Sequence, residues 1–136
     1  MKLKDAYIEV TERSIDAAEA TLAADRHEAT AFYSYHAFES LGGAFCISLG
    51  QAYSTDHAKK INQFVAATRT HTTTRGIGLT IANIAIEVFS LRNKCLYPQE
   101  LVSGSSTTPS QHITKKKAEK LLRKVKGVTA KMKKQI

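Results

Sequence analysis

Proline occurs at only two positions in this 136-residue chain, Pro98 and Pro109, and both fall in one short segment. Proline removes a backbone donor and breaks helices, so its absence elsewhere leaves the rest of the chain free to be helical. Alanine, the strongest helix former, is frequent before and after Asp25. The chain is therefore predicted to be all-α, a single domain over residues 1–136 folded as an up-and-down antiparallel helical bundle of about five helices.

Apolar residues at helical spacing locate these helices. They are expected over residues 4–25, 28–49, 56–68, about 75–97 and 114–134. Asp56 and Thr114 are residue types that cap helix N-termini, and they are predicted to start the third and the last helix. The segment 98–113 combines both prolines with a Ser/Thr/Gly run, so it is predicted to be a mobile or functional loop.

The adjacent pair Gly42-Gly43 interrupts the second predicted helix. Each glycine costs about 1 kcal/mol relative to alanine within a helix. The pair is therefore predicted to permit a close helix approach or a bend.

Positive charge is concentrated at one end of the chain. The last 23 residues hold ten Lys/Arg and a single acid, Glu119, whereas the first 113 residues hold ten Lys/Arg and eleven Asp/Glu. A basic last helix at 114–134 can attract phosphates, anionic lipid or an acidic protein, and charge alone does not choose among them. A solvated helix face is the simpler alternative.

Several function classes lack their sequence patterns. The histidines show no metal-binding spacing such as HExxH, and no phosphate loop, nucleophile elbow or cofactor motif is present, so no metal or cofactor is expected. Cys46 and Cys95 lie in apolar helical contexts without CxxC spacing and are predicted to be buried thiols. No segment approaches the ~20 apolar residues of a membrane span, and a cytoplasmic location is expected.

An arginine follows directly after the apolar stripe of the fourth helix. The stripe consists of Ile77, Ile81, Ile84, Val88 and Leu91. Arg92 comes next, with Asn93 and Lys94 beside it and Tyr97 about one turn later. The guanidinium fork suits a phosphate group. The alternative is that Arg92 pairs with Glu87 or with a carbonyl at the helix C-terminus.

These residues resemble a known family. The segment Ala31-Phe32-Tyr33-Ser34-Tyr35-His36-Ala37-Phe38-Glu39-Ser40-Leu41, the turn at Gly50, the helix opened by Asp56-His57, the Leu91-Arg92-Asn93 element and the start of the last helix at Ile113 are similar to the HEPN domain. The resemblance covers about residues 28–134. It implies a helical bundle that dimerises with its arginine-bearing helices facing each other. Many such proteins are metal-independent endoribonucleases, in which the arginine stabilises the phosphorane and a histidine moves protons.

The resemblance can be carried over residue by residue. Arg92 matches the family's arginine and Asn93 its polar residue, whereas the positions for the histidine hold Tyr97, Pro98 and Gln99. A phenol with an ordinary pKa near ~10 is a poor base at pH 7, although it can donate a hydrogen bond. Arg92, Asn93 and Tyr97 are predicted to form the site, and Tyr97 shifts the expectation from catalysis toward binding.

Two functions follow from this pattern. The first is an RNA- or nucleotide-binding protein that forms a homodimer. It is either a weak metal-independent endoribonuclease of a toxin or defence system, or a degenerate member that holds RNA or nucleotide without cutting it. Its phosphate contacts would be Lys94, Lys115, Lys116, Lys117, Lys120 and Lys124. The second is a non-catalytic interaction module, an antitoxin or accessory subunit that docks an acidic protein or DNA through its basic last helix. Membrane-surface binding is disfavoured, because that helix has no Trp or Phe on its apolar face.

Three histidines stand outside the family's spacing. His36 and His57 are expected to have surface or helix-capping roles, and His112 falls in the predicted loop. The sequence leaves open whether any of them reaches Arg92.

Overall fold

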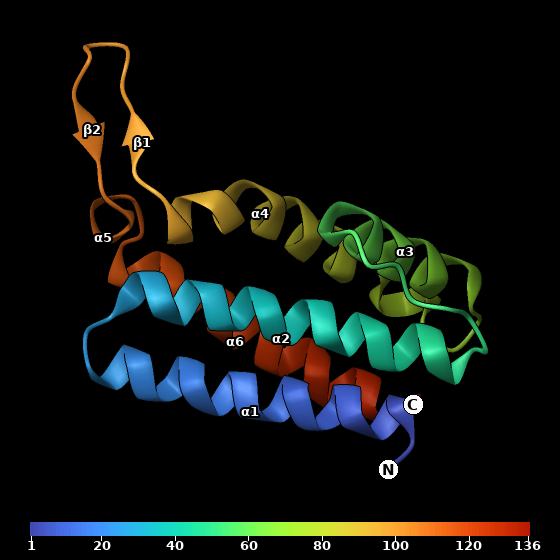
Figure 1. The fold of residues 1–136 in the computed structure, drawn as a ribbon. Helices are drawn as coiled ribbons and strands as arrows, with labels where there is room; N and C mark the ends of the chain where they lie inside the picture. The colour runs from blue at the N-terminus through green and yellow to red at the C-terminus, as the bar shows by residue number, and fades with distance from the viewer.

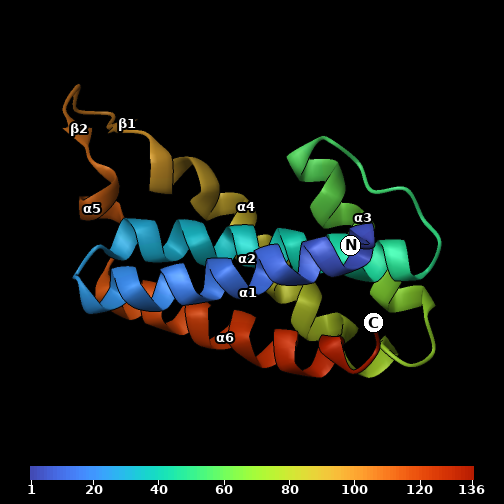
Figure 2. The same cartoon turned by 60° about the horizontal axis from the view of Figure 1, so that its bottom comes forward.

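Four long helices alternate in direction along the molecule, and a shorter helix packs across two of them (Figure 1). The computed structural model describes residues 1–136. Its helices are α1 (Leu3–Ala23), α2 (His27–Ser48), α3 (His57–Thr70), α4 (Gly78–Leu96), α5 (Pro109–His112) and α6 (Lys115–Lys133), with a 3-10 turn, η1 (Arg75–Ile77), before α4. The long helices are α1, α2, α4 and α6, and α1, α2 and α6 run alongside one another (Figure 2). The predicted all-α up-and-down bundle is confirmed.

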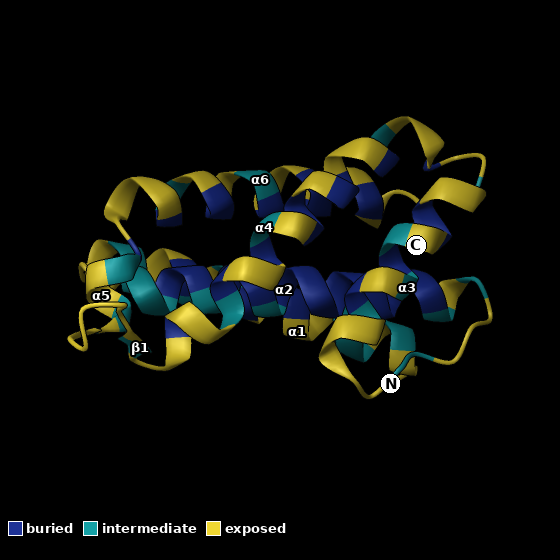
Figure 3. Cartoon of the chain, turned by 90° about the horizontal axis from the view of Figure 1, so that it is seen from above, coloured by how far each residue is buried: buried dark blue, intermediate teal, exposed yellow.

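Helix α2 is the centre of the bundle. It contacts α1, α3, α4 and α6, and most of its ribbon in Figure 3 has the colours of buried and intermediate residues. Phe38 and Phe45 of α2 pack against Phe64 of α3, with ring centroids 5.1 and 6.2 Å apart. Because α2 is surrounded on most sides, a polar residue on it must find its partners inside the protein.

The glycine pair of α2 lies where neighbouring aromatic side chains approach most closely. A Cβ atom on Gly42 would lie 2.7 Å from Phe64 Cγ and from Tyr53 Oη, and one on Gly43 would lie 2.9 Å from the ring of Tyr7. No side chain fits there without displacing a ring. The prediction of a close approach is confirmed, and it brings Tyr53 and α3 onto α2.

Both predicted caps are present. Asp56 Oδ1 accepts a hydrogen bond from Lys59 N over 2.9 Å at the start of α3. Thr114 Oγ1 accepts one from Lys117 N over 3.2 Å at the start of α6. These bonds satisfy backbone donors that have no partner within their own helices.

The segment 98–113, predicted as a loop, contains a hairpin and a short helix. Strands β1 (Gln99–Glu100) and β2 (Ser106–Thr107) pair antiparallel and project beyond the bundle (Figure 1). Gly104 closes the turn at a φ of +83°, which favours glycine. Helix α5 starts at Pro109 behind a capping box between Thr108 and Gln111. The sequence prediction gave weight to the Ser/Thr/Gly composition of the segment and therefore did not use the turn at Gly104 or the capping residues Thr108 and Gln111.

Ion pairs connect the last helix to the first. Lys126 Nζ lies 2.5 Å from Glu19 Oε1, and Lys133 pairs with Glu12. The two chain ends also meet, since Lys4 Nζ lies 3.5 Å from the carbonyl oxygen of Ile136. None of the helices combines the length and the apolar composition needed to cross a bilayer.

Candidate functional site

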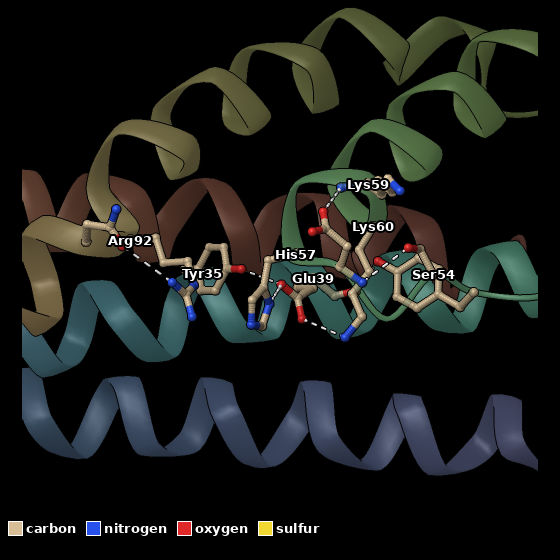
Figure 4. Close-up of polar contacts among 10 residues, drawn as sticks. Tyr35, Glu39, Ser54, His57, Lys59, Lys60 and Arg92 are labelled. Atoms are coloured by element: carbon tan, nitrogen blue, oxygen red, sulfur yellow. Dashed lines mark hydrogen bonds and ion pairs between the residues drawn. The ribbon is translucent and has the colours of Figure 1, made fainter.

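Glu39 of α2 is a buried carboxylate with three side-chain partners. Tyr35 Oη donates a hydrogen bond to Glu39 Oε2. Lys60 Nζ donates to Oε1 over 3.1 Å, and His57 Nδ1 lies 2.8 Å from Oε2. Figure 4 shows these side chains converging on the carboxylate from α2 and α3. The core of the protein therefore holds a fixed charge at this point.

The surroundings of Glu39 keep it ionised. Burial alone would raise the pKa of this carboxyl, but the hydrogen bonds from its three partners outweigh burial, and its pKa lies below the ordinary value. An ionised carboxylate only accepts hydrogen bonds, so His57 Nδ1 must donate the bond between them. His57 Nε2, which makes no hydrogen bond within the protein, is then the nitrogen free to accept a proton.

Tyr35 is held in its protonated form. Burial, followed by the hydrogen bond to Glu39, raises the pKa of the phenol above its ordinary value, while the nearby Arg92 opposes the shift. Tyr35 therefore serves as a hydrogen-bond donor and does not act as a base.

Local features of the chain bring His57 to Glu39. Tyr53 Oη donates a hydrogen bond to the carbonyl oxygen of Glu39 over 2.7 Å, which fastens the α2–α3 connection to α2. Asp56 then caps α3, so His57 is the first residue of that helix. The helix start and the fastened connection together fix the half-exposed imidazole beside the carboxylate.

Arg92 and His57 line the same pocket. The pocket measures about 280 Å³ and lies between α2, α3 and α4. Tyr35 and Phe89 also line it, as does Asn93. In Figure 4 the Arg92 guanidinium lies beside the Tyr35 ring, with His57 beyond it toward Glu39. Residues far apart in the sequence thus form one concave site.

Arg92 has no acidic partner in the protein. Its Nη1 donates a 3.4 Å hydrogen bond to Asn93 Oδ1, and its buried Nε has no hydrogen-bond partner. The alternative pairing with Glu87 is wrong, because Glu87 Oε2 instead accepts from Lys124 Nζ over 2.9 Å. The guanidinium is therefore available to an anion in the pocket.

Tyr97 does not line this pocket. Helix α4 ends at Leu96, and Tyr97 adopts an extended conformation at its C-terminus with an exposed side chain. The extended backbone carries the phenol out of the helical register that points Arg92 inward. The structure brings together Arg92 and Asn93 of the predicted trio, and supplies His57 instead of Tyr97 beside them.

The predicted lysines fall into separate groups. Lys94, Lys117 and Lys120 line a second pocket, between α4, α5 and α6. Lys124 pairs with Glu87, whereas Lys115 and Lys116 are exposed in the first turn of α6 and line neither pocket. The second pocket uses the face of α4 opposite Arg92, as the 3.6-residue period requires.

The remaining histidines lie outside the Arg92 pocket. His36 stacks on Phe32 with ring centroids 6.3 Å apart, and burial lowers its pKa. His112 Nε2 lies 2.5 Å from Thr107 Oγ1, at the base of the hairpin. No group of three His, Cys, Asp or Glu side chains is arranged to hold a metal ion.

Comparison with known families agrees with this architecture. The family model for the HEPN domain matches residues 5–135, nearly the whole chain. The chain belongs to the HEPN domain family. Membership points to an RNA-related or nucleotide-binding role for this HEPN protein. No curated protein and no solved structure matches the chain.

Sequence reasoning missed three residues of the site. Tyr35 and Glu39 are four apart on α2, the spacing at which two helical side chains meet, and this was the available signal for their hydrogen bond. The signal for His57 was its place directly after the Asp56 cap. Neither signal indicates that Arg92 of α4 lines the same pocket as Tyr35 and His57.

Proposed function

We propose that this HEPN protein binds single-stranded RNA at the Arg92 pocket and cleaves it without a metal ion. One observation carries the proposal: Arg92 and His57 line one pocket, and His57 is oriented by the buried Glu39. A carboxylate that holds Nδ1–H fixes the tautomer whose Nε2 accepts a proton. The pairing of a free arginine with an oriented histidine supports phosphodiester chemistry more than simple docking.

The chemistry follows from these two side chains. His57 Nε2 takes the proton from a ribose 2′-hydroxyl as its oxygen attacks the adjacent phosphorus. Arg92 donates to the phosphoryl oxygens and stabilises the negative charge that develops on them. The bond to the 5′ oxygen breaks, this oxygen takes up a proton from water, and the proton held by His57 neutralises the hydroxide that is left, so that a 2′,3′-cyclic phosphate and a free 5′-hydroxyl are the products. Asn93, bonded to Arg92 Nη1, keeps the guanidinium in place.

Helix α4 also presents an apolar surface next to the pocket. Leu79, Ile86 and Phe89 are 72%, 70% and 44% exposed, and their spacing of seven and three residues puts them on one side of the helix. Phe89 also lines the pocket. We propose that a second copy of the chain covers this surface, so that two Arg92 pockets face each other in a homodimer. Ile86→Glu is expected to give a monomer in analytical ultracentrifugation, whereas Leu3→Glu, at an exposed site on α1, leaves the dimer intact. A wild-type monomer contradicts the dimer.

The cleavage proposal is tested with labelled single-stranded RNA and purified protein in excess chelator. Arg92→Ala and His57→Asn are each expected to lower the cleavage rate by about 10²-fold or more, the usual contribution of a positioned base or an oxyanion donor. His71→Asn is the matched control, since His71 lies outside the pocket and contacts Thr73 and Phe45 instead. Products should carry a 2′,3′-cyclic phosphate.

Three results contradict this function in different ways. Cleavage that requires a metal removes the mechanism. Cleavage that survives both substitutions moves the chemistry elsewhere. Salt-dependent RNA binding without any cleavage would show that the protein binds RNA and is not a ribonuclease. The absence of both binding and cleavage favours the non-catalytic interaction module.

A further inference from the structure

The face of α4 opposite Arg92 borders a second pocket with a different composition. This pocket measures about 270 Å³. Its wall combines Lys94 of α4, His112 of α5, and Lys117 and Lys120 of α6. Three separate helices thus bring positive or protonatable groups to one concave surface.

The lysines of this pocket lack counter-charges. Glu87 is the single acid in its wall, and Lys124 already occupies that carboxylate at 2.9 Å. Lys94, Lys117 and Lys120 form no ion pair with any carboxylate of the chain. Like charges brought close together repel one another, so the binding of an anion in this pocket relieves the repulsion and lowers the free energy.

The position of the pocket at the start of α6 adds to this preference. Helix N-termini attract anions through unpaired N–H groups and the helix dipole, yet Lys117 stands in the first turn of α6. An anion near Lys117 relieves the unfavourable interaction between its ammonium group and the dipole. His112 uses Nε2 to contact Thr107, and its Nδ1 has no hydrogen-bond partner in the protein.

We propose that this pocket is a phosphate-binding site, separate from the Arg92 pocket. Several ammonium groups around one cavity match an anion with several oxygens and more than one negative charge, as in a run of phosphates. The phosphates belong either to a free nucleoside triphosphate or to an RNA strand that extends beyond the Arg92 pocket. The site requires no cleavage at Arg92, so the proposal stands independently of the ribonuclease activity.

The test compares two triple variants with equal loss of charge. The pocket variant carries Lys94→Gln, Lys117→Gln and Lys120→Gln. The control carries Lys2→Gln, Lys131→Gln and Lys134→Gln, at exposed lysines outside this pocket and outside the Arg92 pocket. Inorganic tripolyphosphate is titrated into each protein by calorimetry, after circular dichroism has shown that both are folded.

The pocket variant is expected to lose about tenfold in affinity for tripolyphosphate for each ammonium contact that is removed, because a hydrogen bond to a charged group is worth about that factor. The control variant and Arg92→Ala should retain wild-type affinity. Equal affinity in the two triple variants, or no binding by wild type, overturns the proposal.

Two further titrations identify the source of the phosphates. For single-stranded RNA, the slope of log affinity against log salt should fall by about 2 in the pocket variant if three strand contacts are lost. If the RNA slope is the same in both triple variants and ATP affinity falls only in the pocket variant, the ligand is a free nucleotide. Loss of both RNA slope and ATP affinity assigns the pocket to phosphate runs of either source.

Discussion

Glu39 and Glu87 each hold a lysine, at 3.1 and 2.9 Å, but in different surroundings. The Glu39 side chain is 4% exposed and its lysine 17%, whereas the corresponding values for Glu87 and its lysine are 25% and 39%. Glu39 also accepts hydrogen bonds from Tyr35 and His57, while Glu87 has the single lysine partner. Helix α4 therefore contacts a rigid, buried charge network on one face and a solvent-screened basic surface on the other.

This difference has consequences for the two pockets. On the Arg92 face the polar groups fix one another, which suits a reaction that needs defined geometry. On the Lys94 face long lysine side chains are unpaired and exposed to water, which suits electrostatic attraction of a flexible polyanion. Substitutions that remove one contact at a time test this contrast between the buried Glu39 network and the exposed Glu87 pair.

The largest effect is expected from Glu39→Ala. Deleting the carboxylate leaves the largely buried Lys60 ammonium and the buried Tyr35 hydroxyl without their partner, which should lower the free energy of unfolding by about 3–5 kcal/mol. Urea titration followed by circular dichroism measures the loss. Glu39→Gln is the matched variant, because its amide keeps an acceptor oxygen and should cost less. Equal losses in both variants would show that packing, and not the charge network, sets the cost.

Acid should weaken the same network by a smaller amount. The pKa of Glu39 is lower in the folded protein than its ordinary value of 4.5, so its contribution is fully present above that pH and is lost as the pH falls through the folded pKa. The protonated carboxyl still accepts hydrogen bonds, which limits the loss. The stability advantage of wild type over Glu39→Gln should therefore shrink from pH 6 to pH 3 in urea titrations. Parallel pH curves for the two proteins contradict the depressed pKa.

Local rules were sufficient to predict most of the frame that supports this network. Apolar spacing located the long helices, Asp56 and Thr114 capped them as their side-chain chemistry predicts, and the glycine pair marked a close approach. The thiols Cys46 and Cys95 are buried, and burial raises the pKa of each to about 11. The signal for each of these features lies in residues that are close together in the sequence.

The site itself depends on contacts between helices, which local rules do not describe. Arg92 was identified because it follows an apolar stripe, but its histidine comes from α3, whose crossing of α2 and α4 is set by the whole core. Tyr97 was chosen because it stands at a position of the family's histidine. In the structure α4 ends at Leu96, the backbone becomes extended, and Tyr97 lies outside the pocket.

A moderate effect is expected where α2 admits the aromatic side chains. Gly42→Ala places a Cβ 2.7 Å from Phe64 Cγ and Tyr53 Oη, and should lower the free energy of unfolding by about 1–3 kcal/mol through overpacking. It should also weaken the hydrogen bond from Tyr53 to Glu39. RNA cleavage should then slow, because this bond holds the α2–α3 connection that positions His57. Gly127→Ala is the control, since a Cβ there meets nothing and alanine favours the helix. A Gly42→Ala protein as stable as wild type would mean that α3 can shift without cost.

The smallest effect is expected on the basic face of α4. Glu87→Gln removes the carboxylate from the Lys124 pair, and a partly exposed ion pair of this kind contributes about 0–1 kcal/mol. Thermal unfolding should therefore shift little, in contrast to the Glu39 variants. The same substitution removes the one negative charge from the lysine-lined pocket, so tripolyphosphate affinity should rise while cleavage at Arg92 stays unchanged. A loss of stability as large as that of Glu39→Ala would contradict the contrast between the two carboxylates. An unchanged affinity would show that Glu87 and its lysine partner neutralise each other before the phosphate arrives.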